Sequence, residues 1–327
     1  MTVAFRAIRE SDPGPKWAAM FAELWPAYRK WWSRDGLTAR PTYRECRNAL
    51  VRHMPEITDL YDELCELGGG GDLEARFLSF YCPPPYLSGC SQAVWSGDEA
   101  LLVRNYDYDA RAFDAISLHT SWQGRRVMGT SDGMFGVVDG MNDQGLAVSL
   151  TFGGRREVGT GFGVPLILRY ILQTCETARE AGKALQRIPC HMSYNVTVLD
   201  AARNFLTVYL APDRPAIITH LPVATNHQEQ VEWKSHARLT ATVERQRYLL
   251  NRLAMHPETQ ARFLNNFLQP PLYSIAFGSG FGTLYTAAYW PERGAMQLLW
   301  PQQGWEMTFD DFQERILTVS YPAVSSG

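Results

Sequence analysis

The run Leu87-Ser88-Gly89-Cys90-Ser91-Gln92 lies where the sequence changes character. Before it, apolar residues recur every three or four positions, as on one face of an α-helix. After it come short apolar runs of the kind that form strands, separated by turn residues. We therefore predict an α+β protein with a helical segment over residues 1–89 and a strand-rich domain over residues 90–327.

The first 80 residues show the helical pattern most clearly. One stripe comprises Trp17, Met20, Phe21, Leu24, Tyr28 and Trp31, and a second comprises Ile57, Leu60, Tyr61, Leu64 and Cys65. A stripe of this kind can serve as a ligand box or a partner surface. We interpret it instead as a helix face that packs on the rest of the protein.

The remainder of the chain alternates strand-like runs with a few helices. Strands are predicted over residues 100–106, 126–129, 135–138, 145–152, 194–199, 205–210 and 216–224. Helices are predicted over 164–187, with a break near Thr177, and over 237–253, followed by a β-rich stretch over 272–300. Hairpin-linked strands with helices inserted in pairs predict a layered sandwich with antiparallel sheets, not a βαβ alternation.

Composition excludes several classes of protein. The chain has 327 residues, 46% of them hydrophobic, with a net charge of −3 and no basic stripe, so we expect no nucleic-acid partner. The N-terminus lacks the apolar core of a signal peptide, and no run approaches the roughly 18 apolar residues of a membrane span. We expect a cytoplasmic protein without a membrane partner. The six cysteines contain no C-x-x-C pair, so no metal, cofactor or disulfide framework is expected.

Four short motifs follow one another in order: Gly89-Cys90-Ser91, Arg104-Asn105-Tyr106-Asp107, Asp139-Gly140-Met141-Asn142-Asp143-Gln144-Gly145-Leu146 and Ala224-Thr225-Asn226-His227. With this order and spacing, residues 90–248 resemble the cysteine branch of the N-terminal-nucleophile hydrolases. That branch includes choloylglycine hydrolases, penicillin V acylases, acid-ceramidase-like amidases and the acyl-coenzyme A:6-aminopenicillanic acid acyltransferase group (peptidase family C45). The resemblance implies a four-layer αββα sandwich. It also implies cleavage between Gly89 and Cys90, after which the N-terminal fragment stays paired with the C-terminal one.

The resemblance makes Cys90 the nucleophile. A thiolate divides the difficult cleavage of an amide into two easier steps. Once Cys90 becomes an N-terminus, its own α-amino group, with a reference pKa of about 7.7 to 8.0, can act as the base. In the precursor the same nitrogen is an amide and cannot take a proton. Gly89 suits this site because a residue without Cβ leaves its carbonyl open to the thiol and tolerates strained backbone angles.

Arg104 and Asp107 correspond to the family's arginine and aspartate that flank the nucleophile. A cation beside a sulfur favours the thiolate, and a carboxylate can orient the new amine. The alternative is an ion pair at a strand end. Residues three apart on a flat strand point to opposite faces, so we expect the chain to bend near Tyr106 if both side chains are to reach Cys90.

The resemblance also assigns roles to three later residues. Asn226 corresponds to the asparagine whose amide binds the oxyanion of the tetrahedral intermediate. Thr151 stands where bile-salt hydrolases have an oxyanion asparagine, which leaves the second donor open. Arg245 aligns with a further active-site arginine, and a solvated position on a charged helix is the alternative.

These residues predict a self-processing cysteine amidohydrolase or acyltransferase that acts on a small linear N-acyl amide. Two alternatives stay open. One is a thiol hydrolase without self-cleavage in which His191 or His227 pairs with Cys90, and the other is a binding protein that keeps the fold without processing. Substrate identity, hydrolysis against transfer, and association into homo-oligomers are not determined by the sequence.

Overall fold

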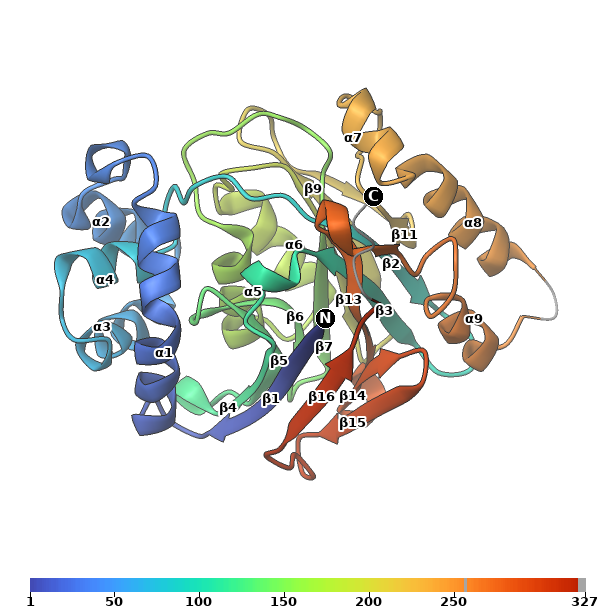
Figure 1. Cartoon of the computed structure of the whole chain (residues 1–327), viewed down its shortest axis with the longest axis horizontal. Coiled ribbons are helices and arrows are strands. Elements are labelled where there is room, and N and C mark those ends of the chain that lie inside the picture. Colours follow the sequence, from blue (N-terminus) through green and yellow to red (C-terminus); the bar gives the residue numbers. More distant parts are fainter. Residues whose placement is uncertain (256–257, 323–327) are drawn as a thin grey trace.

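A computed structural model describes residues 1–255 and 258–322, which form two β-sheets packed face to face between helical layers (Figure 1). Its helices are α1 (Pro15–Trp32), α2 (Tyr43–His53), α3 (Thr58–Leu67), α4 (Asp72–Leu78), α5 (Val164–Thr174), α6 (Ala178–Arg187), α7 (Lys234–Leu239), α8 (Thr242–Ala254) and α9 (Gln260–Asn266). Its strands are β1 (Thr2–Glu10), β2 (Gly89–Trp95), β3 (Leu101–Tyr108), β4 (Ile116–Thr120), β5 (Val127–Asp132), β6 (Gly136–Asn142), β7 (Leu146–Phe152), β8 (Tyr194–Asp200), β9 (Phe205–Leu210), β10 (Ile217–Thr219), β11 (Val223–Ala224), β12 (Ile275–Ala276), β13 (Phe281–Trp290), β14 (Ala295–Trp300), β15 (Gln303–Thr308) and β16 (Ile316–Ser320).

The first sheet has the strand order β10-β9-β8-β7-β6-β5-β4-β1-β16. Its neighbours pair antiparallel, except that β1 runs parallel to β4. Helix α5 packs on β5, β6 and β7, and α6 packs on β8 and β9. Almost every residue of α5 is buried, because the helix contacts the sheet, α6 and the turn at Pro55–Ile57. These helices form one outer layer.

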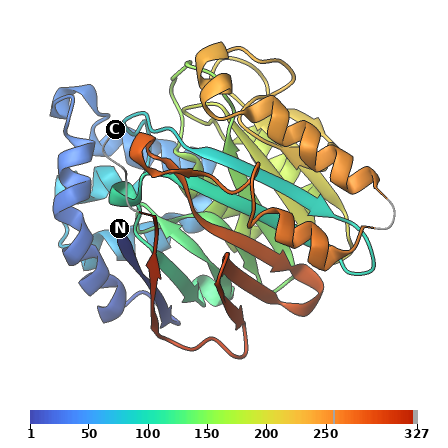
Figure 2. The same cartoon turned by 45° about the vertical axis from the view of Figure 1, so that its right-hand side comes forward.

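The second sheet has the order β11-β2-β3-β13-β14-β15, with β12 beside β13. Its outer face is covered by α8 and α9, whose Leu249 and Phe263 share an apolar cluster with Ala93 and Val103 (Figure 2). Its inner face packs on the first sheet through contacts of β2 and β3 with β7 and β8. The layers are therefore helix, sheet, sheet, helix, which confirms the predicted αββα sandwich.

The N-terminal region differs from the helical segment predicted for it. Residues Thr2–Glu10 form a strand in which Phe5 and Ala7 are buried. This strand lies between β4 and β16, so the chain's first residues complete the first sheet. Helices α1 to α4 follow and stand together at one side of the molecule (Figure 1). The expectation of a purely helical segment was wrong. The strands that pair with β1 lie more than a hundred residues away, so the local pattern of residues 2–10 does not show them.

Two predicted elements are each divided in the structure. The run 216–224 forms β10 and β11, which belong to different sheets. The helix expected over 237–253 is interrupted at Ala241, whose φ of 45° is left-handed, so that α7 ends before α8 begins. Both interruptions bear on the site, because Asn226 follows β11 and Arg245 lies in the first turns of α8.

Within the described ranges, the model contains no helix that combines the length and the apolar character needed to cross a bilayer.

Candidate active site

Cys90 lies at the start of β2, the strand between β11 and β3. Alternate residues of a strand face opposite ways. Cys90 therefore points into the space between the sheets, whereas Ala93 points toward α8 and α9. The cysteine is fully buried, and its Sγ lies 3.5 Å from Ser88 Oγ. In the uncleaved chain the sulfur is therefore closed off from solvent.

Arg104 shares the inner face with Cys90, because β3 places it opposite Gln92. Its Nη2 lies 3.3 Å from Cys90 Sγ, and its Nε donates to the carbonyl of Leu150 at 2.7 Å. The guanidinium also stacks over the ring of Tyr106, 4.3 Å from its centroid. The guanidinium predicted beside the sulfur thus contacts the sulfur, a backbone carbonyl and an aromatic ring.

Asp139, on β6 of the facing sheet, is the counter-charge of Arg104. Its Oδ2 accepts from Arg104 Nη1 and from the hydroxyl of Tyr285, and its Oδ1 accepts from Tyr289. All four side chains are fully buried. The sequence analysis quoted Asp139 within a motif and gave it no role. A carboxylate in an apolar strand needs a buried cation, and this was the signal that could have linked it to Arg104.

Asp107 lies on the opposite face of the sheet from the sulfur. The register between β2 and β3 is regular from Gly89 to Trp95, whereas the pairing of β3 with β13 shifts register between Tyr106 and Asp107. This irregularity does not bring Asp107 to the face that carries the sulfur. Asp107 Oδ1 accepts from Thr283 at 2.7 Å, and Oδ2 accepts from Arg245 Nη1 at 3.0 Å. Burial raises the pKa of Asp107 to about 6, against the opposing effect of Arg245. Asp107 is thus connected to Cys90 through intermediaries, not by direct contact.

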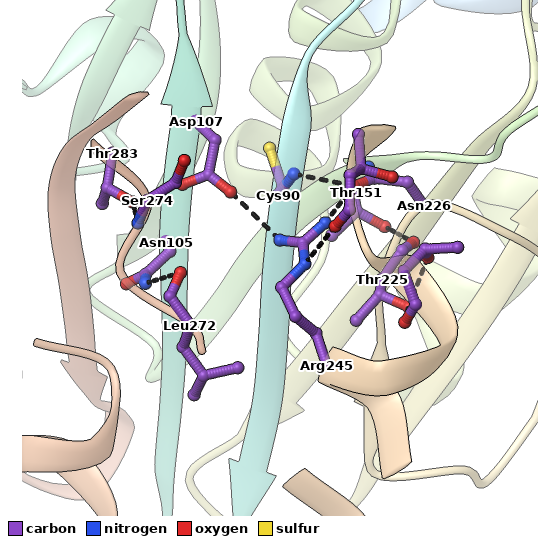
Figure 3. A network of polar contacts seen from close by, with 12 residues as sticks. Cys90, Asn105, Asp107, Thr151, Thr225, Asn226, Arg245, Leu272, Ser274 and Thr283 are labelled. Atoms are coloured by element: carbon purple, nitrogen blue, oxygen red, sulfur yellow. Dashed lines mark hydrogen bonds and ion pairs between the residues drawn. The ribbon is translucent and has the colours of Figure 1, made fainter. Parts of the chain in front are cut away.

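Arg245 and Asn226 are those intermediaries. Asn226 Oδ1 accepts from the backbone N–H of Cys90 at 3.1 Å and from Arg245 Nη2 at 2.7 Å. Arg245 is buried, and its Nε donates to the Thr240 carbonyl exposed by the break before α8. A continuous chain of polar contacts therefore runs from Asp107 through Arg245 and Asn226 to the nitrogen of Cys90 (Figure 3). The solvated position considered for Arg245 was wrong.

The amide nitrogen of Asn226 points to the segment before Cys90. Its Nδ2 donates to the Phe152 carbonyl at 3.2 Å and, over a longer 3.4 Å, to the Ser88 carbonyl. The orientation of the amide is determined by its other end, because both Arg245 and the Cys90 N–H are donors and require an oxygen. A side-chain donor is thus held one residue from the Gly89–Cys90 bond.

Thr151 has a different contact from the one expected of an oxyanion donor. Its Oγ1 donates to the Thr225 carbonyl at 2.7 Å and accepts from Asn195 Nδ2 at 3.0 Å. Asn195 Nδ2 also donates to the carbonyls of Thr225 and His227. Thr151 and Asn195 therefore fasten the loop that carries Asn226. Asn195, the second residue of β8, was missed by the sequence analysis.

The histidines considered as partners of Cys90 are engaged elsewhere. His227 contacts Thr242 Oγ1 at 2.9 Å and Gln246 Oε1 at 3.2 Å, and His191 contacts the Phe162 carbonyl at 3.3 Å. In the part of the chain that the structure describes, neither ring forms a hydrogen bond with Cys90. The geometry gives no support to a cysteine–histidine pair.

Close packing favours glycine at position 89. Its φ is not positive, so the left-handed conformation that glycine tolerates is not used here. A Cβ at this position would lie 3.1 Å from Phe281 and 3.3 Å from Cβ of Asp107. A larger residue would therefore require Phe281 and Asp107 to shift by a few tenths of an ångström beside the bond that precedes Cys90.

Comparison with known proteins identifies the family. Residues 95–305, more than half of the chain, match the family described as acyl-coenzyme A:6-aminopenicillanic acid acyl-transferase. The match contains Arg104, Asp107, Asn226 and Arg245, and it begins five residues after Cys90. A search of curated proteins found no match.

Solved structures with a similar arrangement are distant in sequence. A mutant of conjugated bile acid hydrolase from Clostridium perfringens has a TM-score of 0.47 and 12% identity, over 71% of this chain and 97% of that one. The Caenorhabditis elegans ortholog of N-acylethanolamine-hydrolyzing acid amidase has a TM-score of 0.47 and 15% identity, over 67% and 99%. Penicillin V acylase from Agrobacterium tumefaciens has a TM-score of 0.39 and 16% identity, over 66% and 84%.

The extent of the family match, on a chain with this αββα architecture, decides the classification. The chain belongs to the acyl-coenzyme A:6-aminopenicillanic acid acyl-transferase family and is an amidohydrolase or acyltransferase of the N-terminal-nucleophile type.

Proposed function

We propose that this chain is a precursor that cleaves its own Gly89–Cys90 bond and then uses Cys90 to cleave a small N-acyl amide. One observation carries the proposal. The nitrogen of Cys90 is bound by Asn226, while its sulfur lies beside Arg104 on the inner face of the sheet. The two atoms that an N-terminal nucleophile uses are thus held separately, each by its own network, before any cleavage has occurred.

The first reaction takes place within the chain. The sulfur of Cys90 attacks the carbonyl carbon of Gly89, so that an S–C bond forms and the peptide C–N bond breaks. The thiol proton passes to the departing nitrogen, which becomes the α-amine of Cys90. Water then hydrolyses the thioester and leaves a carboxylate on Gly89 and a free thiol on Cys90. Burial of the sulfur in the intact chain supports this order, in which self-cleavage comes before work on an external substrate.

The second reaction repeats this chemistry on an amide from outside. The α-amine accepts the thiol proton and passes it to the leaving amine, while the acyl group becomes a thioester on Cys90. Asn226 Oδ1 accepts from the amine and so directs its lone pair away, toward the thiol. Arg104 stabilises the thiolate. Water or an acceptor amine then takes the acyl group, which gives hydrolysis or transfer.

Asn226 Nδ2 supports the same scheme as the oxyanion donor. In the uncleaved chain it reaches the Ser88 carbonyl. Departure of that segment leaves the N–H free, beside the position of the reacting carbonyl. A donor aimed in advance at developing negative charge contributes about 10² to 10³ in rate. The hydroxyl of Thr151 is engaged with Thr225, so a second donor would have to come from another group.

Trapping the acyl group tests this function. The processed enzyme is mixed briefly with a p-nitroanilide of a short acyl group, quenched in acid and digested, and the peptide that begins at Cys90 is weighed. We expect the acyl mass on that peptide, and loss of anilide cleavage after alkylation with iodoacetamide. Cys65→Ala, which removes a cysteine from α3, serves as the control and should keep activity. Undiminished activity with Cys90 alkylated would exclude the mechanism.

A further inference from the structure

The proton of the Cys90 thiol needs an acceptor before self-cleavage can begin. In the proposed mature enzyme the α-amine of Cys90 takes that role. In the uncleaved chain the same nitrogen is an amide, and its N–H donates to Asn226 Oδ1 at 3.1 Å. The cysteine is fully buried, so solvent does not reach the sulfur directly. The first reaction therefore needs an internal route for this proton, which the second reaction does not use.

Two side chains contact the sulfur within the described residues, namely Arg104 through Nη2 at 3.3 Å and Ser88 through Oγ at 3.5 Å. Arg104 has donors only, so it stabilises a thiolate but takes no proton. The carboxylates of the site are engaged elsewhere. Asp139 accepts from Arg104 and from two tyrosine hydroxyls, and Asp107 pairs with Arg245 on the other face of the sheet. The hydroxyl oxygen of Ser88 is thus placed to accept the thiol proton.

The segment that carries Ser88 is held on its way into β2. Arg34 Nη2 donates to the carbonyl of Pro85 at 3.1 Å, and Asn226 Nδ2 donates to the carbonyl of Ser88 over a longer 3.4 Å. Ser88 itself is buried. Among residues 1–255 and 258–322, its hydroxyl forms a hydrogen bond with the sulfur of Cys90 and with no other group. The hydroxyl proton of Ser88 is therefore available for donation.

A hydroxyl is a weak base, so it does not keep the proton of a thiol. It can instead accept one proton while it donates its own to a second atom, because it is both a donor and an acceptor. Ser88 lies two residues before the departing nitrogen, on the segment that carries the reacting bond. Asn226 Oδ1 binds the N–H of Cys90. The lone pair that the nitrogen gains as its C–N bond breaks therefore points away from Asn226 and can receive a proton.

We infer that Ser88 is a catalytic residue of self-cleavage, which relays the thiol proton of Cys90 to the departing nitrogen. The S–C bond to Gly89 forms and the C–N bond breaks. The thiol proton moves to Ser88 Oγ, and the hydroxyl proton of Ser88 moves to the nitrogen, so Ser88 ends unchanged. The relay rests on the proposed function, because it gives the route of a proton that self-cleavage has to move. It is used once, since the new α-amine then acts as the base.

The time course of cleavage tests the relay. Chain freshly made by cell-free synthesis is desalted into buffer at pH 7, and loss of the uncleaved chain is followed by intact-mass measurement. Proton transfer by a positioned side chain contributes about 10² to 10⁴ in rate, so we expect Ser88→Ala to cleave at least tenfold more slowly than wild type. Ser91→Ala is the matched control. It removes a buried hydroxyl that has no hydrogen-bond partner in the described residues, and it should cleave within twofold of wild type.

A second pair of variants separates the hydroxyl from the shape of the side chain. Threonine and valine have the same shape, and only threonine has a hydroxyl. We expect Ser88→Thr to cleave at least fivefold faster than Ser88→Val, so the test does not depend on the folding of Ser88→Ala. Equal rates in the threonine and valine variants would overturn the inference.

The pH dependence distinguishes a relay from a structural role. Without the hydroxyl, the thiol has to lose its proton to solvent base, whose concentration rises with pH. We therefore expect the ratio of the wild-type rate to the Ser88→Ala rate to fall at least threefold between pH 7 and pH 9. A large ratio that stays constant with pH would indicate a structural role and contradict the relay. Wild type and Ser88→Ala cleaving at equal rates would overturn the relay and leave the proposed function standing, whereas a folded wild-type chain that stays whole would remove both.

Discussion

Buried charge surrounds Cys90 on both faces of its sheet. Arg104 and Asp139 lie on the sulfur side, and Arg245 and Asp107 lie on the side of the helices. A single buried ion pair is weak evidence for stability, because desolvation offsets much of the attraction. Here the pairs meet at one residue from opposite directions, one near its sulfur and the other through Asn226 near its nitrogen. This convergence on one residue is what the proposed reaction at Cys90 requires.

The sequence analysis identified most residues of the site, but it did not show which of them contact one another. The motif that contains Arg104 and Asp107 was recognised, but Asp107 contacts Arg245 and Thr283 and does not reach Cys90 directly. Strand alternation sends Asp107 to the other face, where a helix from 138 residues further along the chain supplies Arg245. No pattern local to β3 could show that partner. Thr151 lies beside the loop that carries Asn226, but its hydroxyl donates to the Thr225 carbonyl in that loop.

The titration of Asp107 predicts an acid limit on self-cleavage. Its pKa is raised from 3.8 to about 6, so the folded state holds the proton more tightly than the unfolded chain. The contribution of Asp107 to stability is therefore greatest at low pH and falls as pH rises between these values. Its pairing with Arg245 has the opposite dependence, because it needs the ionised carboxylate. We expect the cleavage rate, followed by gel after a pH jump, to fall below about pH 6.

The variant Asp107→Asn tests whether Asp107 causes the fall in cleavage rate below about pH 6. It should cleave slowly at all pH values and lack the fall near pH 6. Asp132→Asn, which removes another carboxyl group with a pKa of about 6, should retain the fall because Asp132 is hydrogen-bonded to Tyr28, whereas Arg245 pairs with Asp107. An unchanged profile in Asp107→Asn would mean that another group is titrating.

Asn226 is expected to have a larger effect on rate than on stability. Replacing it with alanine removes the acceptor of the Cys90 nitrogen and the donor near the reacting carbonyl, so anilide cleavage by any processed enzyme should fall by about 10² to 10³. Asn251→Ala, on the exposed side of α8, is the matched control and should be close to wild type. A loss of less than threefold in Asn226→Ala, with the fold intact by circular dichroism, would remove Asn226 from the mechanism.

At the scale of elements, the most informative strands are those that join distant parts of the chain. The sequence predicted the core strands and the break near Thr177, which caps α6. It missed β1, although Val3, Phe5 and Ala7 alternate with polar or exposed positions. It also merged β10 with β11. Local alternation shows that a strand exists, but the choice of sheet depends on partners that are remote in sequence.

Strands β6 and β13 hold Arg104 from two directions, which predicts a large effect on stability at Asp139. Asp139→Asn leaves the guanidinium without its counter-charge and should lower the free energy of unfolding by about 3 to 5 kcal/mol. Tyr289→Phe, which removes a single hydrogen bond to the carboxylate, should cost about 1.5 to 3 kcal/mol. Urea unfolding measures both. An Asp139→Asn protein as stable as wild type would contradict the account of this network.

On the scale of the whole molecule, residues 1–89 pack into the same fold as the residues that follow Cys90. Strand β1 pairs with β4 and β16, and the indole of Trp17 donates to the carbonyl of Met134 at 2.9 Å. We therefore predict that the fragments on either side of Cys90 co-elute in size-exclusion chromatography and separate only in denaturant. Deletion of residues 1–10 should prevent stable expression. Fragments that separate under native conditions would contradict this view of the segment.

The central claim is that the peptide bond before Cys90 is cleaved by Cys90 itself. Intact-mass measurement of the freshly purified chain tests it most directly. The account predicts fragments of 89 and 238 residues, with a single uncleaved mass in Cys90→Ala and normal cleavage in Cys65→Ala. A wild-type chain that remains whole and yet cleaves N-acyl amides would contradict it.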